Sequence, residues 1–145
     1  MREVLALSGV PAIDLAGELR FGETADLLRG ASLYVGPDTA TSHLAAACGT
    51  PAVVLFGPTD PRLWGPLPQG GLDAPYEPVA PSQRRGNVLL LQEPSLACVP
   101  CQREGCERHR LSFSACLDAL SGASVIEAAR TLLEQVTAPA ASPPA

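Results

Sequence analysis

Residues 32–57 constrain the fold more than any other stretch of this chain, because two short apolar runs flank a polar turn and an alanine-rich run. The first apolar run covers residues 32–35, and the second covers residues 52–56. Residues 44–48 have the composition of a helix, with Gly49 placed just past its end. The order of strand, turn, helix and strand predicts a βαβ unit, whose continuously apolar strands suit a parallel sheet covered on both faces.

The turn before the helix carries five polar residues, Asp38, Thr39, Thr41, Ser42 and His43. In a βαβ unit, ligands bind beyond the carboxyl ends of the strands, where the helix N-terminus favours a phosphate. Asp38 would repel a phosphate, so we expect it to cap the helix or to bind a sugar hydroxyl. Polar residues are ordinary at a helix start, so a capped helix that binds nothing is the alternative.

Three motifs resemble glycosyltransferase family 9, the heptosyltransferases of lipopolysaccharide core assembly, and they occur in the order in which that family has them. They are DTATSHLAAA at residues 38–47, GTP at residues 49–51 and FGPTDP at residues 56–61. The resemblance extends over about residues 13–136, which is nearly the whole chain.

The resemblance implies the GT-B architecture, in which two Rossmann-like domains enclose the active site. It predicts an α/β fold, with a Rossmann-like parallel sheet flanked by helices, as a truncated C-terminal nucleotide-sugar-binding domain over residues 1–137. Residues 138–145 are rich in Ala, Pro and Ser and are expected to form a disordered tail.

The implied reaction is the inverting transfer of a heptose from ADP-heptose to a lipopolysaccharide core sugar, with no required cofactor. Such a transfer needs a base for the acceptor proton. In the family this base lies in the N-terminal domain, and the phosphate-binding lysine and the ribose-binding acidic residue also lie upstream. We therefore expect this chain to be the donor-binding half of the enzyme and to be inactive alone.

The resemblance also assigns the donor-binding residues, which are Asp38, Thr39, Ala40 and His43, with Leu19 against the nucleotide base. The N–H groups at positions 39 and 40, the Thr39 hydroxyl and His43 would hold the phosphate, whereas Asp38 would orient the sugar or cap the loop. Plain packing is the alternative for Leu19. The family usually has Gly where this chain has Ala40, and a methyl group there narrows the approach to the phosphate and penalises φ > 0.

Five further elements are expected from apolar spacing: the end of a helix at residues 2–7, a strand at 12–15, a helix at 24–30, a strand at 87–92 and a helix at 124–136. Ser124 and Glu127 are spaced as the capping box of the last helix.

The segment of residues 67–86 is rich in proline and glycine and is expected to be a loop. Arg84 and Arg85 form its only basic pair, which would suit an acidic acceptor sugar or a phosphate. A solvated pair is the alternative. The resemblance implies that the turn of residues 57–61 shapes the floor of the donor cleft. Its prolines predict a stiff turn, and a rigid surface turn without a role in the chemistry is the alternative.

Four cysteines, Cys98, Cys101, Cys106 and Cys116, have the ligand count of a tetrahedral zinc site. They would also suit an iron–sulfur cluster, although the spacing fits neither ferredoxin pattern. Free or buried thiols are the alternative, and Cys48 is expected in the core. A non-catalytic Rossmann-like interaction module with a zinc site is therefore the competing function.

The composition limits the partners and the location. The net charge is −5 with no long basic run, which argues against binding to nucleic acid. No apolar stretch approaches the length of a membrane span, and Met1 is not followed by the apolar core of a signal peptide. We expect a cytoplasmic protein, with peripheral attachment to the inner membrane as an option. An unpaired sheet edge would favour a homodimer.

Overall fold

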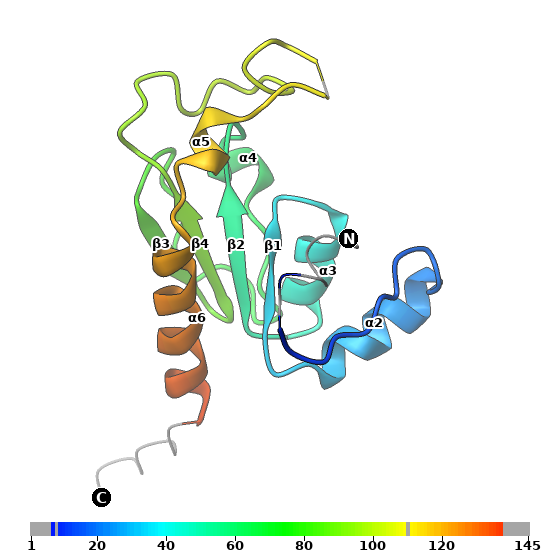
Figure 1. Ribbon diagram of the computed structural model, residues 1–145. Coiled ribbons are helices and arrows are strands. Elements are labelled where there is room, and N and C mark those ends of the chain that lie inside the picture. The colour runs from blue at the N-terminus through cyan, green and yellow to red at the C-terminus, as the bar shows by residue number, and fades with distance from the viewer. Residues whose placement is uncertain (1–6, 8, 110, 138–145) are drawn as a thin grey trace, which may run out of the picture.

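A four-stranded sheet forms the centre of the computed structural model, which describes residues 7, 9–109 and 111–137 (Figure 1). The strands are β1 (Tyr34–Pro37), β2 (Ala52–Phe56), β3 (Ser82–Arg85) and β4 (Val88–Gln92), in the order β1-β2-β4-β3. The helices are α2 (Phe21–Gly30), α3 (Ala40–Ala47), α4 (Pro61–Trp64), α5 (Ala115–Asp118) and α6 (Gly122–Thr137). The predicted α/β class, a sheet flanked by helices, is confirmed.

The predicted βαβ unit is present, because β1 and β2 are parallel and are joined through α3. Tyr34 pairs with Ala52, and Pro37 pairs with Leu55. Strand β4 adds in parallel on the other side of β2. The carboxyl ends of β1, β2 and β4 therefore lie at one edge of the sheet.

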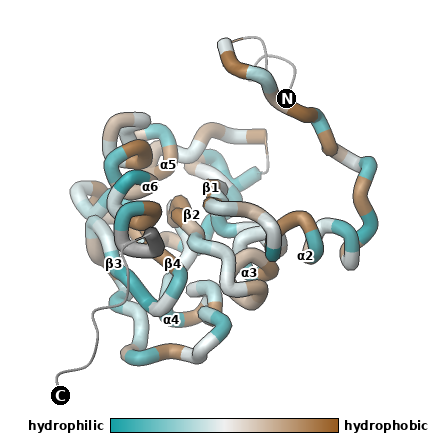
Figure 2. The backbone as a smooth tube through the Cα atoms, turned by 90° about the horizontal axis from the view of Figure 1, so that it is seen from below, coloured by the Kyte–Doolittle hydropathy of each residue, from teal (hydrophilic) through white to brown (hydrophobic). Residues whose placement is uncertain are grey.

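Side chains alternate between the two faces of the sheet and make two apolar clusters. Ala52, Val54 and Phe56 of β2 pack with α2 and α3, whereas Val53 packs with Leu132 and other residues of α6. Figure 2, seen from below the first view, shows α3 and α6 on opposite sides of the strands. Both faces of β2 are thus covered, which accounts for its continuously apolar sequence.

The expected loop at residues 67–86 contains a strand, so that prediction was wrong at its C-terminal end. Ser82–Arg85 forms β3, which pairs antiparallel with β4 and makes the sheet mixed rather than parallel. A tight turn at Gly86 (φ +50°) and Asn87 joins the two strands, and β4 begins at Val88. The Gly-Asn dipeptide is the hairpin signal that the proline-rich composition obscured.

The expected strand at residues 12–15 was also wrong. Ile13 is 84% exposed, and Asp14 accepts a hydrogen bond from the Ala16 N–H in a turn that continues into Gly17 at φ +80°. No strand in the described part of the chain pairs with this segment, and Figure 2 shows the stretch before α2 lying apart from the sheet. The expected helix end at residues 2–7, apart from Leu7, and the expected tail at residues 138–145 lie outside the described residues.

The last helix begins earlier than predicted, at Gly122. The hydroxyl of Ser121 accepts a hydrogen bond from the Ser124 N–H at 3.1 Å, so Ser121 caps the helix in place of Ser124. Helix α2 likewise starts at Phe21 rather than residue 24, because the Glu23 carboxylate accepts from the Arg20 N–H at 2.8 Å.

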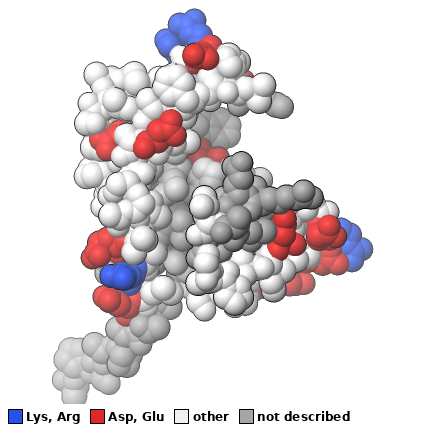
Figure 3. Space-filling model, viewed as in Figure 1, with Lys and Arg blue, Asp and Glu red and all other residues white. Residues whose placement is uncertain are grey.

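Within the described residues, every helix is too short or too polar to span a bilayer. The face drawn in Figure 3 carries more acidic than basic groups, in keeping with the net charge of −5.

Candidate functional site

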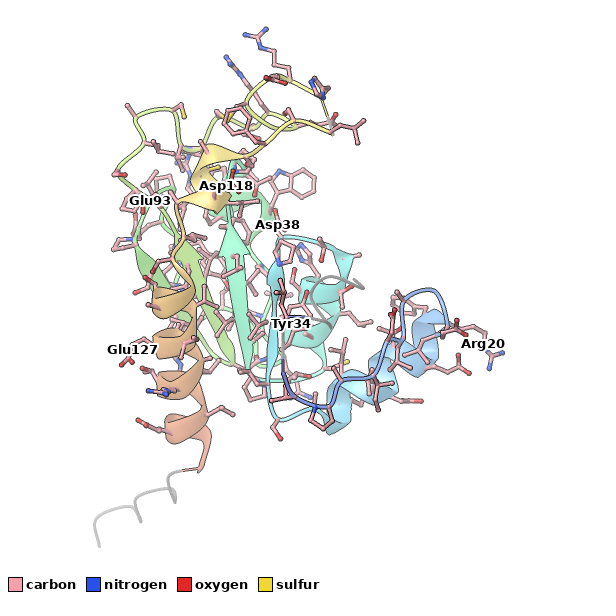
Figure 4. All side chains as sticks on the ribbon, in the orientation of Figure 1. Arg20, Tyr34, Asp38, Glu93, Asp118 and Glu127 are labelled. Carbon is pink, nitrogen blue, oxygen red and sulfur yellow. The ribbon has the colours of Figure 1, made fainter. Side chains whose placement is uncertain are left out.

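The candidate site lies where β1 and β2 end and α3 begins. The Asp38 N–H donates to the Leu55 carbonyl at 3.1 Å, which continues the pairing of the two strands by one step beyond β1. Figure 4 shows Asp38 at the end of β1, beside the start of α3. The site therefore occupies the edge of the sheet at which α/β proteins bind ligands.

The carboxylate of Asp38 is held from two sides. The Thr59 hydroxyl donates to Asp38 Oδ2 at 2.7 Å, and His43 Nε2 lies 3.5 Å from Oδ1. The Asp38 side chain is 16% exposed. Because its oxygens face Thr59 and His43, Asp38 does not cap α3, and the prediction that it caps the helix was wrong.

Thr39 is the N-cap of α3, and Ser42 completes the cap. Ser42 Oγ accepts from the Thr39 N–H at 3.1 Å and donates to the Thr39 carbonyl at 2.6 Å. The N–H at position 39 is therefore used within the protein. The N–H groups of Ala40 and Thr41 stand in the first helical turn, where no preceding helical carbonyl accepts from them.

Ala40 is the first residue of α3 and has helical backbone geometry. Among the non-glycine residues that the structure describes, positive φ occurs at Gln102 and Arg108. The expected φ penalty at Ala40 therefore does not arise. The methyl group of Ala40 still lies on the surface of a cavity, described below, so its steric effect remains relevant.

A cavity of about 590 Å³ opens beside Asp38 and has three walls. Residues 37–39 form the first wall, and residues 57–59 form the second. The third wall comes from residues 98–117, which we call the cysteine-bearing segment. It includes Arg103, Glu104, Gly105, Ser112, Ser114 and Leu117. The cavity combines hydroxyl groups with both signs of charge, which suits a polar ligand.

A smaller cavity of about 190 Å³ lies beside the same helix start. It is lined by Leu19, Phe21, Thr24, Ala40, Thr41 and Leu44. Leu19 is half-buried and Phe21 is 76% exposed, so an apolar surface is open to a ligand here. The structure thus brings Leu19 and Ala40 together, in a cavity that Asp38 does not line.

The turn after β2 is rigid, as predicted. Asp60 is buried and caps α4 by accepting from the Arg62 N–H at 3.0 Å. Its carboxylate also accepts from Arg62 Nη2 at 2.7 Å, and this guanidinium holds the pKa of Asp60 below its ordinary value of 3.8. Pro61 is buried at the first position of α4. These contacts fix the position from which Thr59 reaches Asp38.

Arg84 and Arg85 are not brought to this site. They lie on β3, at the opposite edge of the sheet from β1. Arg85 donates from Nε to the Ala74 carbonyl at 2.7 Å and lies over the Tyr76 ring, 5.4 Å from its centroid. Its side chain is 15% exposed, so its donors hold the loop before β3.

The four cysteines of the expected metal site are free thiols and are not gathered into one group. Among the described residues, no cluster of three or more His, Cys, Asp or Glu side chains is arranged to hold a metal ion. Cys106 Sγ accepts from the Ala115 N–H at 3.4 Å, and the buried Cys116 lies 3.4 Å from Ser114 Oγ. The zinc hypothesis, and the competing function that depended on it, gain no support. Cys48 packs against the core, as predicted.

Two parts of the site were missed from the sequence. The position of Thr59 beside Asp38 could have been predicted, because neighbouring parallel strands end at the same edge of the sheet and the turns that follow them lie side by side. No sequence pattern predicts the third wall of the larger cavity. It depends on a hydrogen bond from the Gln102 N–H to the Pro58 carbonyl at 2.7 Å, which folds the cysteine-bearing segment back over the turn.

Comparison with known proteins gives one consistent family. The family model described as glycosyltransferase family 9 (heptosyltransferase) matches residues 1–106. Lipopolysaccharide heptosyltransferase 3 of Escherichia coli K12 is 46% identical over 56 residues, which cover 39% of this chain and 16% of that protein. Lipopolysaccharide heptosyltransferase 1 of Salmonella typhimurium is 42% identical over 57 residues, covering 39% and 18% of the two chains.

A third relative, lipooligosaccharide heptosyltransferase 2 of Haemophilus influenzae, is 36% identical over 55 residues, which cover 38% of this chain and 16% of that protein. The aligned segment is therefore less than a fifth of the length of each of these relatives. No solved structure gives a significant match.

Proposed function

This chain belongs to glycosyltransferase family 9, the heptosyltransferases, and from that premise we propose that it binds the nucleotide-sugar donor of a heptosyl transfer. One observation carries the proposal. Two cavities adjoin the same helix start, with Asp38 and Thr39 lining the larger and Leu19 and Ala40 lining the smaller. A nucleoside diphosphate sugar has the matching division into base, diphosphate and sugar.

The diphosphate crosses the first turn of α3 in this proposal. The N–H groups of Ala40 and Thr41 and the hydroxyl of Thr39 donate to it, with His43 as a further donor, and the helix dipole favours its charge. The Thr39 hydroxyl donates over a long distance of 3.4 Å to the Pro37 carbonyl, so its proton can turn to a ligand at little cost.

The base lies in the smaller cavity against Leu19 and Phe21, whose apolar surfaces suit a heterocycle. The sugar lies in the larger cavity, where Asp38 accepts hydrogen bonds from its hydroxyls. Thr59 holds that carboxylate in one orientation before the donor arrives. Such preorganisation lowers the entropic cost of binding.

The reaction is the transfer of heptose from ADP-heptose to a hydroxyl of the lipopolysaccharide core, with inversion at the anomeric carbon. The names of the curated relatives support a lipopolysaccharide heptosyltransferase. Donor groups at α3 stabilise the departing diphosphate. The base that deprotonates the acceptor comes from a separate N-terminal domain, so the described residues bind donor without turning it over.

The donor is cytoplasmic in this proposal, and the acceptor is presented at the inner membrane.

Strand β1 lies at an edge of the sheet, and Val35 on it is 44% exposed. Among the described residues no further strand pairs with β1, so this edge is open to a second copy of the chain. Light scattering tests the homodimer, and a monomer at all concentrations would contradict it.

Titration of the ¹⁵N-labelled chain with ADP and with adenosine tests donor binding. We expect ADP to shift the amide signals of Ala40, Thr41, Leu19 and Phe21. Adenosine should shift the signals of Leu19 and Phe21, which would contact the base, and leave those of Ala40 and Thr41, which would contact the diphosphate, unshifted. An absence of saturable shifts at millimolar ADP, or shifts confined to other elements, would overturn the proposal.

A further inference from the structure

We propose that Arg103 binds the diphosphate of the donor from the side opposite α3. The inference rests on the proposed function and adds a residue from outside the motif of residues 38–47. Arg103 belongs to the cysteine-bearing segment, for which no role in donor binding was expected from the sequence.

Arg103 lines the same cavity as Thr39 and Thr59. Gln102, the residue before it, is fixed to the wall formed by residues 57–59, because the Gln102 N–H donates to the Pro58 carbonyl at 2.7 Å. Gln102 has φ +56°, a left-handed conformation that turns the chain at this point. The backbone of Arg103 is therefore held next to the turn whose Thr59 holds Asp38.

The segment after Arg103 folds back on itself and holds the third wall in place. The Cys106 N–H donates to the Phe113 carbonyl at 3.0 Å, and the Ala115 N–H donates to Cys106 Sγ. Gly105 has φ +94°, and a Cβ atom there would collide with Ser112 Oγ. Only glycine fits this close crossing, so the wall is a tight loop with a defined position.

The charges in the cavity call for a cation when a diphosphate lies at its edge, across the first turn of α3. Asp38 and Glu104 both line it, and their carboxylates would repel the phosphates. The helix start supplies only a partial positive charge. The chain contains no lysine. Among the described residues, Arg103 is the arginine that lines this cavity, and its planar guanidinium can donate two hydrogen bonds to phosphate oxygens.

Other arginines are committed elsewhere. Arg20 pairs with Glu23, Arg29 pairs with Asp26, Arg62 pairs with Asp60, and Arg85 binds loop carbonyls. Arg103 takes part in none of the ion pairs found between described residues. Its guanidinium is therefore available to a ligand.

Calorimetric titrations of the full chain with ADP and adenosine test the inference, using Arg103→Gln and Arg103→Lys. The control is Arg108→Gln, which changes an exposed arginine of the same segment that does not line the cavity. We expect Arg103→Gln to weaken ADP binding about threefold to tenfold, with the larger loss at low salt. Arg103→Lys should restore part of the affinity. Adenosine binding, and ADP binding by Arg108→Gln, should match those of the wild type.

Equal ADP affinity in the wild type and Arg103→Gln would overturn the role of Arg103 and leave the proposed function standing. Failure of the wild type to bind ADP would instead remove the proposed function itself. If Arg103→Gln does not fold, the NMR signal of the Arg103 Nε–H in the wild type tests the role of Arg103 instead. It should shift with ADP and not with adenosine, and an unshifted signal at saturating ADP would overturn the inference.

Discussion

The Thr59 hydroxyl donates to Asp38 Oδ2 at 2.7 Å, and this hydrogen bond joins the exit turns of two neighbouring parallel strands. The two residues are 21 positions apart in the sequence. Thr59 lies one residue before Asp60, which caps α4 and binds Arg62. The orientation of Asp38 is thus set by a rigid turn as well as by its own helix start.

Replacing Thr59 with Val should disturb both stability and sugar binding. The change keeps the shape of the side chain and leaves the half-buried Asp38 carboxylate without its closest donor, at a cost of about 1–2 kcal/mol. We expect a lower urea midpoint and weaker ADP-heptose binding. Thr131→Val on α6 is the control. If Thr59→Val matched the wild type in both measurements, the hydrogen bond would have no role in the site.

Asp60 should give the protein an acid-sensitive component of stability. Arg62 lowers the pKa of Asp60 in the folded state, so the ion pair contributes fully above the ordinary pKa of 3.8. As pH falls, the unfolded chain binds a proton first, and the contribution is lost as pH drops toward the folded-state pKa. The urea midpoint of the wild type should therefore fall between about pH 5 and pH 2 more steeply than that of Asp60→Asn.

Asparagine is a good N-cap, so Asp60→Asn removes the charge and keeps the cap. Asp26→Asn changes an exposed carboxylate that pairs with Arg29, and it should leave the acid dependence of the wild type in place. Parallel acid profiles of the wild type and Asp60→Asn would show that the ion pair contributes nothing.

The sequence predicted the centre of the molecule better than its periphery. The βαβ unit of residues 34–56 follows from local apolar runs and one glycine stop, and the family suggested by its motifs is confirmed. Strand β3 and the third cavity wall depend on contacts between distant segments. Gln83 is buried with its amide against the main chain of Glu77, and no pattern of apolar residues marks it.

The motif of residues 38–47 lies at a helix start, as predicted, but the capping role expected of Asp38 was wrong. Asp38 was expected at the cap because Asp is a common N-cap, and the structure gives that place to Thr39 and Ser42. The difference arises because the Thr59 hydroxyl donates a hydrogen bond to the Asp38 carboxylate. A partner 21 residues away cannot be identified from propensities alone.

Arg85→Ala and Arg84→Ala should differ in stability. Arg85 binds the carbonyls of Ala74 and Pro75 and covers the Tyr76 ring, so its loss should cost about 2 kcal/mol. Arg84 is exposed, and its loss should change stability by about 0.5 kcal/mol or less. Chemical unfolding measures both. Equal effects, or a larger loss for Arg84→Ala, would contradict a structural role for Arg85.

Ala40→Gly should strengthen ADP binding, because removing the methyl group opens the smaller cavity beside the helix N–H groups. Glycine in a helix costs up to about 1 kcal/mol, so α3 should also become less stable. Ala47→Gly, at the exposed far end of the same helix, is the matched control for that loss. Unchanged or weaker ADP binding by Ala40→Gly would show that the methyl group does not obstruct the phosphate.

In the proposed function, the helix start at residues 38–43 holds the donor, with Asp38 on the sugar and His43 on the diphosphate. Calorimetric titration of ADP and ADP-heptose into the wild type, Asp38→Ala and His43→Ala tests it most directly, with Asp26→Ala as a remote control. We expect Asp38→Ala to lose about tenfold in affinity for ADP-heptose and little for ADP. His43→Ala should weaken both ligands. Equal binding of ADP-heptose by the wild type, Asp38→Ala and His43→Ala would contradict the account.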